Sequence, residues 1–344
     1  MFSRLTGRLC TSFAVALVVL SSAAAPTSAQ DAAAFYKGKT VKFIVGNAPG
    51  GGFDAYARML APHLEKQLGA TVVVQNQPGA GGLVALNSVY KATGDGLQLM
   101  MVNGLGGVLA QLVDDPSVRF DLSKMGVLGI VSYSPWIWIA SPKSPMKSPA
   151  DFLKPGAKVT WAGSGQMGGL SDGAAITCAA FKMDCKIVRG YDGSATAALA
   201  LARGEADAMY VSDTSANNYV KAGNAIPILT MSSEKSEFFP KLPTVFEAVK
   251  LTAEQKWWFE FREAVDDLQR ILAMPPNVPK EQLAYMQQAV AKVLTDPAVI
   301  EEGKKGKRYI KYRDPVKVRS MIGGMIGSIT PEQKKIVKEV LLKE

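Results

Sequence analysis

Three glycine-rich segments contain the residues best suited to binding chemistry. They occupy residues 47–54, 76–82 and 163–169, and each lies between a short apolar run and a stretch with helical spacing. Glycine lets the backbone approach a ligand closely, and the free N–H groups at a helix start attract anions. One such loop is often only a tight turn. Three loops before three helices favour a shared site for a carboxylate, phosphate or sulfate.

These loops do not match nucleotide-binding patterns. No Gly-Lys-Ser/Thr follows four intervening residues, and residues 49–54 lack the third spaced glycine of a dinucleotide fingerprint. Asp54 falls at the expected N-cap of the next helix, where capping contributes about 1 kcal/mol. Its carboxylate could equally accept a hydrogen bond from a ligand hydroxyl, amine or water. Ser171 and Asp172 are interpreted as a helix cap.

The sequence offers little for catalysis. His63 is the only histidine, and it falls on an amphipathic helix away from the glycine loops. A Ser-His-Asp arrangement is therefore unsupported, and no HExxH motif or Cys/His cluster suggests zinc. We predict no catalytic residue, metal site or cofactor. Trp257 and Trp258 are expected to pack in a core or interdomain groove, with ligand stacking as the alternative.

Apolar periodicity predicts two series of strands and helices, and therefore an α/β fold with parallel sheets covered on both faces. The first series has strands at 39–45, 71–74 and 97–102 and helices at 55–68 and 83–92. The second has strands at 136–140, 158–162, 185–189 and 206–211 and helices at 149–153, 171–181 and 196–203. Residues after 251 are more helical, with helices expected at 280–294 and 331–342.

The first 29 residues read as a secretory signal. Arg4 and Arg8 precede an apolar run at 13–25, and the small residues at 27–29 suit cleavage after Ala29. A membrane anchor is the alternative. No later segment reaches about 18 uncharged apolar residues, so a soluble mature chain is expected. Export makes a Cys178–Cys185 disulfide plausible, although two buried free thiols are equally ordinary.

Composition limits the partners. The 344 residues are 48% hydrophobic and 20% charged, which is ordinary for a globular protein and long enough for two domains. Removing residues 1–29 takes away two arginines and no acid, so the formal charge falls from +9 to +7. A basic surface attracts anions. Because no dense Lys/Arg run is interleaved with aromatics, a nucleic-acid partner is not expected.

Several motifs resemble one family. Residues 36–45, 48–54, 74–82 and 95–99 are similar to the first half of the Bug/TctC family, the periplasmic receptors of tripartite tricarboxylate transporters. The similarity resumes at residues 163–164, 191–194, 204–207 and 242–247, with weaker agreement at 275–297. The paired APGGG-D and N-x-PGAGG motifs, in this order, are its most specific part.

The resemblance implies a type II-like periplasmic binding fold with two α/β lobes and a ligand cleft between them. We assign residues 30–135 and 251–344 to lobe 1 and residues 136–250 to lobe 2. The implied function is capture of a small carboxylate for membrane permease subunits, by a periplasmic monomer that is not an enzyme. The implied ligand-binding set is Pro49, Gly50, Gly51, Gly52, Phe53, Asp54, Gly79, Ala80, Gly81, Gly82, Ser164, Gly165, Gln166, Gly169, Ser171, Tyr191, Ser212 and Asp213.

Departures from the family pattern concentrate in the second lobe. They are Gly169, Leu170, Asp192, Val211 and the segment 251–272. The carboxylate end of the ligand is therefore better predicted than its identity. A receptor for another solute class or a sensor system remains the main alternative, followed by an exported enzyme and by a scaffold that has lost ligand binding.

Overall fold

The computed structural model describes residues 27–165 and 168–342 of the chain. Most of the predicted signal peptide, residues 1–26, lies outside the described residues, and so does the predicted site residue Gln166. The described chain begins with helix α1 (Thr27–Tyr36), which packs against α11 (Lys280–Thr295). Among the described residues, no helix combines the length and the apolar character needed to cross a membrane.

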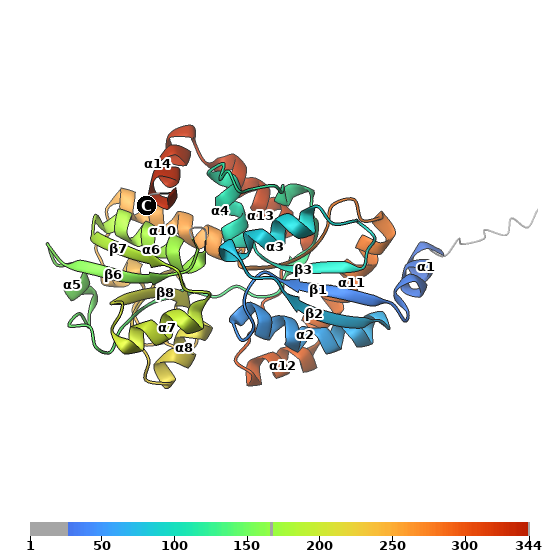
Figure 1. Ribbon diagram of the computed structural model, residues 1–344, viewed down its shortest axis with the longest axis horizontal. Helices are drawn as coiled ribbons and strands as arrows, with labels where there is room; N and C mark the ends of the chain where they lie inside the picture. The colour runs from blue at the N-terminus through green and yellow to red at the C-terminus, as the bar shows by residue number, and fades with distance from the viewer. Residues whose placement is uncertain (1–26, 166–167, 343–344) are drawn as a thin grey trace, which may run out of the picture.

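Two α/β lobes lie side by side, each built on a five-stranded sheet (Figure 1). The first sheet has the order β2 (Thr71–Asn76), β1 (Thr40–Val45), β3 (Gln98–Asn103), β10 (Arg270–Met274) and β4 (Gly126–Ile130). The second has the order β7 (Asp184–Arg189), β6 (Lys158–Gly163), β8 (Ala208–Ser212), β5 (Trp136–Ala140) and β9 (Ile226–Thr230). The predicted two-lobe α/β fold, with a second lobe built like the first, is confirmed.

The prediction of purely parallel sheets was wrong at one strand in each lobe. Strand β10 runs antiparallel to β3 and β4, and β5 runs antiparallel to β8 and β9. Both strands begin where the chain has just crossed from the other lobe, so neither enters its sheet through a right-handed βαβ connection. The reversal brings the first residue of each strand, Arg270 or Trp136, to the edge where the parallel strands end.

The helices of the first lobe cover both faces of its sheet. Helix α2 (Gly52–Leu68) buries an apolar face that includes Ala57, Leu60 and Leu64, and it ends at Gly69, whose φ of 64° is left-handed. This face and α11 pack on one side of the sheet. The remaining helices are α3 (Leu83–Tyr90), α4 (Gly104–Leu112), α12 (Pro297–Lys305) and α13 (Pro315–Ser328).

The second lobe is covered by short and long helices. They are α5 (Pro149–Phe152), α6 (Gly169–Phe181), α7 (Ser194–Arg203), α8 (Asp213–Lys221) and α9 (Val245–Ala248). Helices α10 (Ala253–Asp266) and α14 (Pro331–Leu342) come late in the chain, yet both pack against α6 (Figure 1). Because α10 also contacts α4, the apolar core is continuous between the lobes.

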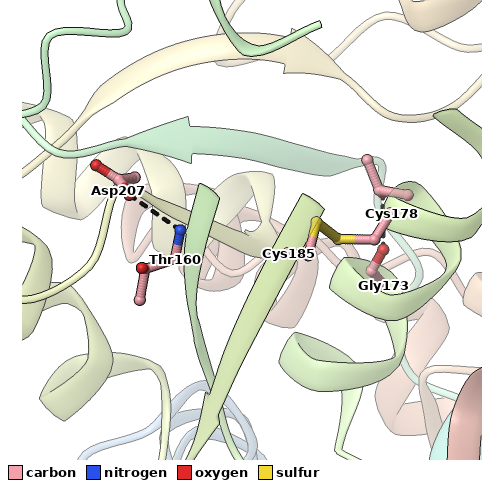
Figure 2. Close-up of a disulfide and its surroundings, with 6 residues drawn as sticks. Thr160, Gly173, Cys178, Cys185 and Asp207 are labelled. Carbon is pink, nitrogen blue, oxygen red and sulfur yellow. Dashed lines mark hydrogen bonds between the residues drawn. A yellow bond between two sulfur atoms is a disulfide. The ribbon is translucent and has the colours of Figure 1, made fainter. Parts of the chain in front are cut away.

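The structure decides between the alternatives left open for two residue pairs, Cys178 with Cys185 and Trp257 with Trp258. Cys178 near the end of α6 and Cys185 in β7 form a disulfide, with 6.2 Å between their Cα atoms (Figure 2). On the neighbouring strand, the backbone N–H of Thr160 donates to Asp207 at 2.9 Å (Figure 2). Trp258 is buried in α10 and makes an edge contact with Trp257, as predicted for a packing role.

Candidate ligand-binding site

A cavity of about 330 Å³ lies between the lobes, within the size range of small-molecule sites. Its walls are the loops after β1, β2, β6 and β7, the starts of α6 and α7, and the end of β8. These are the carboxyl ends of parallel strands, where open α/β sheets bind ligands. The first residues of β5 and β10 complete the wall because those strands run the other way.

The first-lobe wall is a backbone cradle. Residues 79–82 all have positive φ, including Ala80 at 46° and Gly81 at 67°, and the 3₁₀ turn η1 (Ala80–Gly82) forms there. A side chain on Gly46 would lie only 2.9 Å from the Cα of Gly82, so the two glycine loops pack backbone against backbone. The Asn103 amide donates to the Gly81 carbonyl at 3.1 Å and holds the cradle in place.

Asp54 stabilises the first glycine loop of this cradle from outside the cavity lining. It lies in the first turn of α2, whose N-cap is Gly51, so its predicted N-cap position was wrong. The Asp54 carboxylate accepts from the Gly50 N–H at 2.9 Å and from the Arg58 Nε at 2.9 Å. Burial alone would raise the pKa of Asp54, but the hydrogen bonds from Arg58 and Gly50 outweigh it, so the pKa is lowered. Asp54 therefore orders the loop and its carboxylate is already occupied.

The second-lobe wall is held in a similar way. The buried hydroxyl of Ser171 donates to the Ser164 carbonyl at 2.6 Å, which ties the loop after β6 to the first turn of α6. Gly169 lies against the indole of Trp136, since a Cβ there would be 2.5 Å from the ring. Asp213 begins α8 and accepts from Ser236 at 3.1 Å, while burial raises the pKa of Asp213.

A buried cluster of one arginine and two aspartates, Arg262, Asp172 and Asp266, lies behind this wall. The Arg262 guanidinium, from α10, contacts Asp172 at 3.1 Å and Asp266 at 2.6 Å. It also donates to the Gly169 carbonyl at 3.3 Å and lies 5.1 Å from the ring centre of Trp136. Burial raises the pKa of Asp172 to about 6, although Arg262 partly opposes that rise. Two carboxylates facing one guanidinium cannot both ionise without leaving a buried net charge.

Arg270 is a buried charged group of the cavity lining that forms no ion pair with another described residue. Its side chain is buried, with 4% of the residue exposed, and its guanidinium lies 5.3 Å from the ring centre of Phe53 and 4.7 Å from that of Tyr56. One nitrogen donates to Gln269 at 2.9 Å, whereas Nε has no partner. None of the ion pairs among the described residues includes Arg270.

Burial lowers the pKa of Arg270, and the nearby Tyr56 and Asp213 oppose that effect. The arginine side chain still carries its charge at neutral pH. A buried charge without a partner is costly, because its hydration is lost and nothing replaces it. A carboxylate in the cavity would supply the missing charge and accept the free N–H groups in a charge-assisted contact. The site therefore favours an anion.

The predicted site residues divide into two groups. Those that line the cavity are Pro49, Gly51, Gly52, Phe53, Gly79, Ala80, Gly81, Ser164, Gly165, Gly169, Tyr191 and Ser212. Those that do not line it are Gly50, Asp54, Gly82, Ser171 and Asp213, and all five act through the hydrogen bonds and packing described above. Lining residues outside the predicted set include Asn103, Trp136, Arg189, Gln269 and Arg270.

Neither His63 nor a metal-binding cluster belongs to the described cavity lining. The His63 ring contacts Glu302 at 2.8 Å and thereby joins α2 to α12, away from the cavity lining. Within residues 27–165 and 168–342, no group of three or more His, Cys, Asp or Glu side chains is placed to hold a metal ion. The described lining offers backbone amides, hydroxyls and guanidinium groups for binding, together with the carboxylate of Asp192.

Two α/β lobes with a ligand-sized cavity between them define a two-lobe binding protein. Protein BugT from Bordetella pertussis is 28% identical over 242 residues, covering 67% of this chain and 71% of the relative. The solved periplasmic binding protein BugD is similar with a TM-score of 0.72 at 21% identity, covering 89% of this chain and 98% of that one. MatC from Rhodopseudomonas palustris, solved with bound malate, gives 0.71 at 21% identity and covers 88% and 99%.

The family model of the tripartite tricarboxylate transporter family receptor, TctC, matches residues 56–322. The chain belongs to this family, which confirms the resemblance seen in its glycine motifs. Members of the family are solute-binding proteins, and BugD is a periplasmic one.

Proposed function

We propose that this protein is an extracytoplasmic receptor that captures a small carboxylate and delivers it to the permease of a tripartite tricarboxylate transporter. The observation that carries the proposal is the unpaired, buried guanidinium of Arg270 in a cavity lined by glycine loops. A ligand carboxylate would neutralise Arg270 and accept hydrogen bonds from the cradle at residues 79–82. MatC, a structural neighbour solved with malate, is consistent with this ligand class.

The remaining parts of the proposal follow from the same role. The basic residues and apolar run in the first 29 residues would direct the chain to the periplasm as a signal peptide. The working receptor would be a monomer that needs no cofactor, performs no catalysis and binds no nucleic acid. A ligand that touches both lobes would favour their closed arrangement, and the permease would receive the closed receptor.

Thermal-shift and calorimetric titrations of the purified protein test this function. The ligands are mono-, di- and tricarboxylates, with phosphate and sulfate as competing anions. A ligand that binds only the folded protein raises the melting temperature. In Arg270→Met the charge-assisted contact is lost, so the affinity for the best acid should fall about ten- to a hundredfold.

A matched control keeps the change in net charge but leaves the cavity intact. Arg119→Met removes an exposed guanidinium that bonds only backbone carbonyls, so ligand affinity should stay unchanged. The Arg270→Met protein without ligand should be no less stable than the natural one, because an apolar side chain replaces a buried unpaired charge. Equal affinity in Arg270→Met and in the natural protein, or binding of phosphate or sulfate alone, would contradict a carboxylate receptor.

A further inference from the structure

A second guanidinium, that of Arg189, lines the same cavity from the other lobe. Arg189 is the last residue of β7 and pairs in register with Gly163 of β6, directly before the loop that contains Ser164. Its place at the carboxyl end of a parallel strand brings the side chain to the ligand edge of the second sheet. Arg270 reaches the cavity from β10 of the first sheet.

Arg189 shares with Arg270 the lack of a counter-ion. Its Nε is buried without a hydrogen-bond partner, and none of the ion pairs among the described residues includes it. Burial lowers the pKa of Arg189. Several other arginines of the described chain do pair with acids, as Arg58 does with Asp54 and Arg313 with Asp267. Two partly or fully desolvated arginines that form no ion pair among the described residues therefore line one cavity, and the described lining also contains the acid Asp192.

We propose that the ligand carries two anionic groups, one bound at Arg270 and the first-lobe cradle and the other at Arg189 in the second lobe. Arg189 is then the residue that selects diacids over monoacids. This inference rests on the proposed carboxylate-receptor function and specifies which carboxylates that receptor takes.

The wall of the cavity is also partly apolar, because Phe53, Trp136, Leu170 and Val211 line it. A short carbon chain can pack there while its charged ends reach opposite lobes. A diacid would satisfy both arginines only when the lobes are together, so binding and closure would be coupled. A monoacid would satisfy one arginine and leave the other desolvated and unpaired. It would therefore stabilise the closed arrangement of the lobes less than a diacid does.

Calorimetric titration with acids of matched length tests the inference. Succinate and adipate are the diacid probes, and butyrate and hexanoate are the monoacids of the same chain lengths. The natural protein should bind the better diacid at least about tenfold more tightly than its monoacid, because one further charge-assisted contact forms. Arg189→Gln should lose about tenfold in diacid affinity while monoacid affinity changes little. Arg189→Lys should retain part of the preference.

A control on the same strand is Lys186→Gln, which removes an exposed positive charge outside the cavity lining and should alter neither affinity. Melting temperatures without ligand establish that each variant is folded. Equal diacid and monoacid affinities in the natural protein would overturn the two-charge assignment, as would equal losses for both acids in Arg189→Gln. Failure of the receptor function itself looks different: no acid binds the natural protein, or Arg270→Met leaves all affinities intact.

Discussion

Gly165 of the second lobe and Gly81 of the first lobe meet backbone to backbone at the cavity. A Cβ atom on Gly165 would lie 3.2 Å from the Gly81 nitrogen and 3.4 Å from the Ala80 carbonyl carbon. Gly81 also has a φ of 67°, in the left-handed region where glycine is favoured. The described arrangement is therefore a closed one, and it leaves little space for a side chain at this contact.

Gly165→Leu should hold the lobes apart. The inserted side chain meets backbone atoms that cannot rotate away, and overpacking of this kind costs about 1–3 kcal/mol. Because ligand binding requires closure, affinity for the best acid should fall about five- to a hundredfold, with little change in the thermal stability of the free protein. Small-angle scattering of the free variant should show a larger radius of gyration than the natural protein.

Gly324→Ala in α13 is the matched control, because a Cβ there meets nothing within 4 Å. It should leave both ligand affinity and the radius of gyration unchanged. If Gly165→Leu bound the acid as tightly as the natural protein, the contact with Gly81 would not limit closure.

The disulfide between Cys178 and Cys185 should stabilise the second lobe without touching the ligand. The two residues are only seven apart in sequence, so the bridge closes a short loop and should contribute about 2 kcal/mol. In Cys178→Ser/Cys185→Ser the free energy of unfolding should fall by about that amount in denaturant titrations. Reduction of the natural protein should reproduce the loss, and acid affinity should be unchanged, because neither cysteine lines the cavity. A large loss of affinity would instead tie the bridge to the site.

The sequence predicted the lobes and the glycine loops because both depend on local patterns. A β-rich run, a glycine loop and a helix with an apolar face recur in each lobe, and α2 and α3 formed where this pattern placed them. Local patterns do not, however, predict the direction of individual side chains. Asp54 and Ser171 lie at the helix starts that the pattern predicted, in the first turns of α2 and α6, but the direction of each side chain depends on partners such as Arg58 and the Ser164 carbonyl.

Arg270 and Trp136 were missed for a topological reason. Each is the first residue of a strand, and in a parallel sheet that end lies away from the ligand. Only the reversal of β10 and β5, which follows from the two crossings between lobes, brings these residues to the cavity. The available signal was an arginine at the start of the apolar run 271–274, which indicates a charge that must find a partner.

The cluster of Asp172, Asp266 and Arg262 should make stability depend on pH. The pKa of Asp172 is raised to about 6 by burial, and the same cause raises that of Asp266 further. A carboxyl that is harder to ionise in the folded state binds more protons there than in the unfolded chain. The contribution of Asp172 to the free energy of unfolding is therefore fully present below the unfolded-state pKa of about 4, and it is lost as pH rises through about 6.

Asp172→Asn removes this titration while keeping the side chain's size. Between pH 4 and pH 7 the unfolding free energy of the natural protein should fall by about 1–3 kcal/mol relative to that of the variant. Denaturant titrations at several pH values measure this difference. Asp184→Asn, which replaces an exposed acid at the start of β7, is the control: its free energy of unfolding should differ from that of the natural protein by the same amount at every pH. A difference between Asp172→Asn and the natural protein that stayed flat across this range would mean that Arg262 keeps Asp172 ionised. The polar wall behind Gly169 would then carry a fixed charge, and acid affinity should show no matching change over the same pH interval.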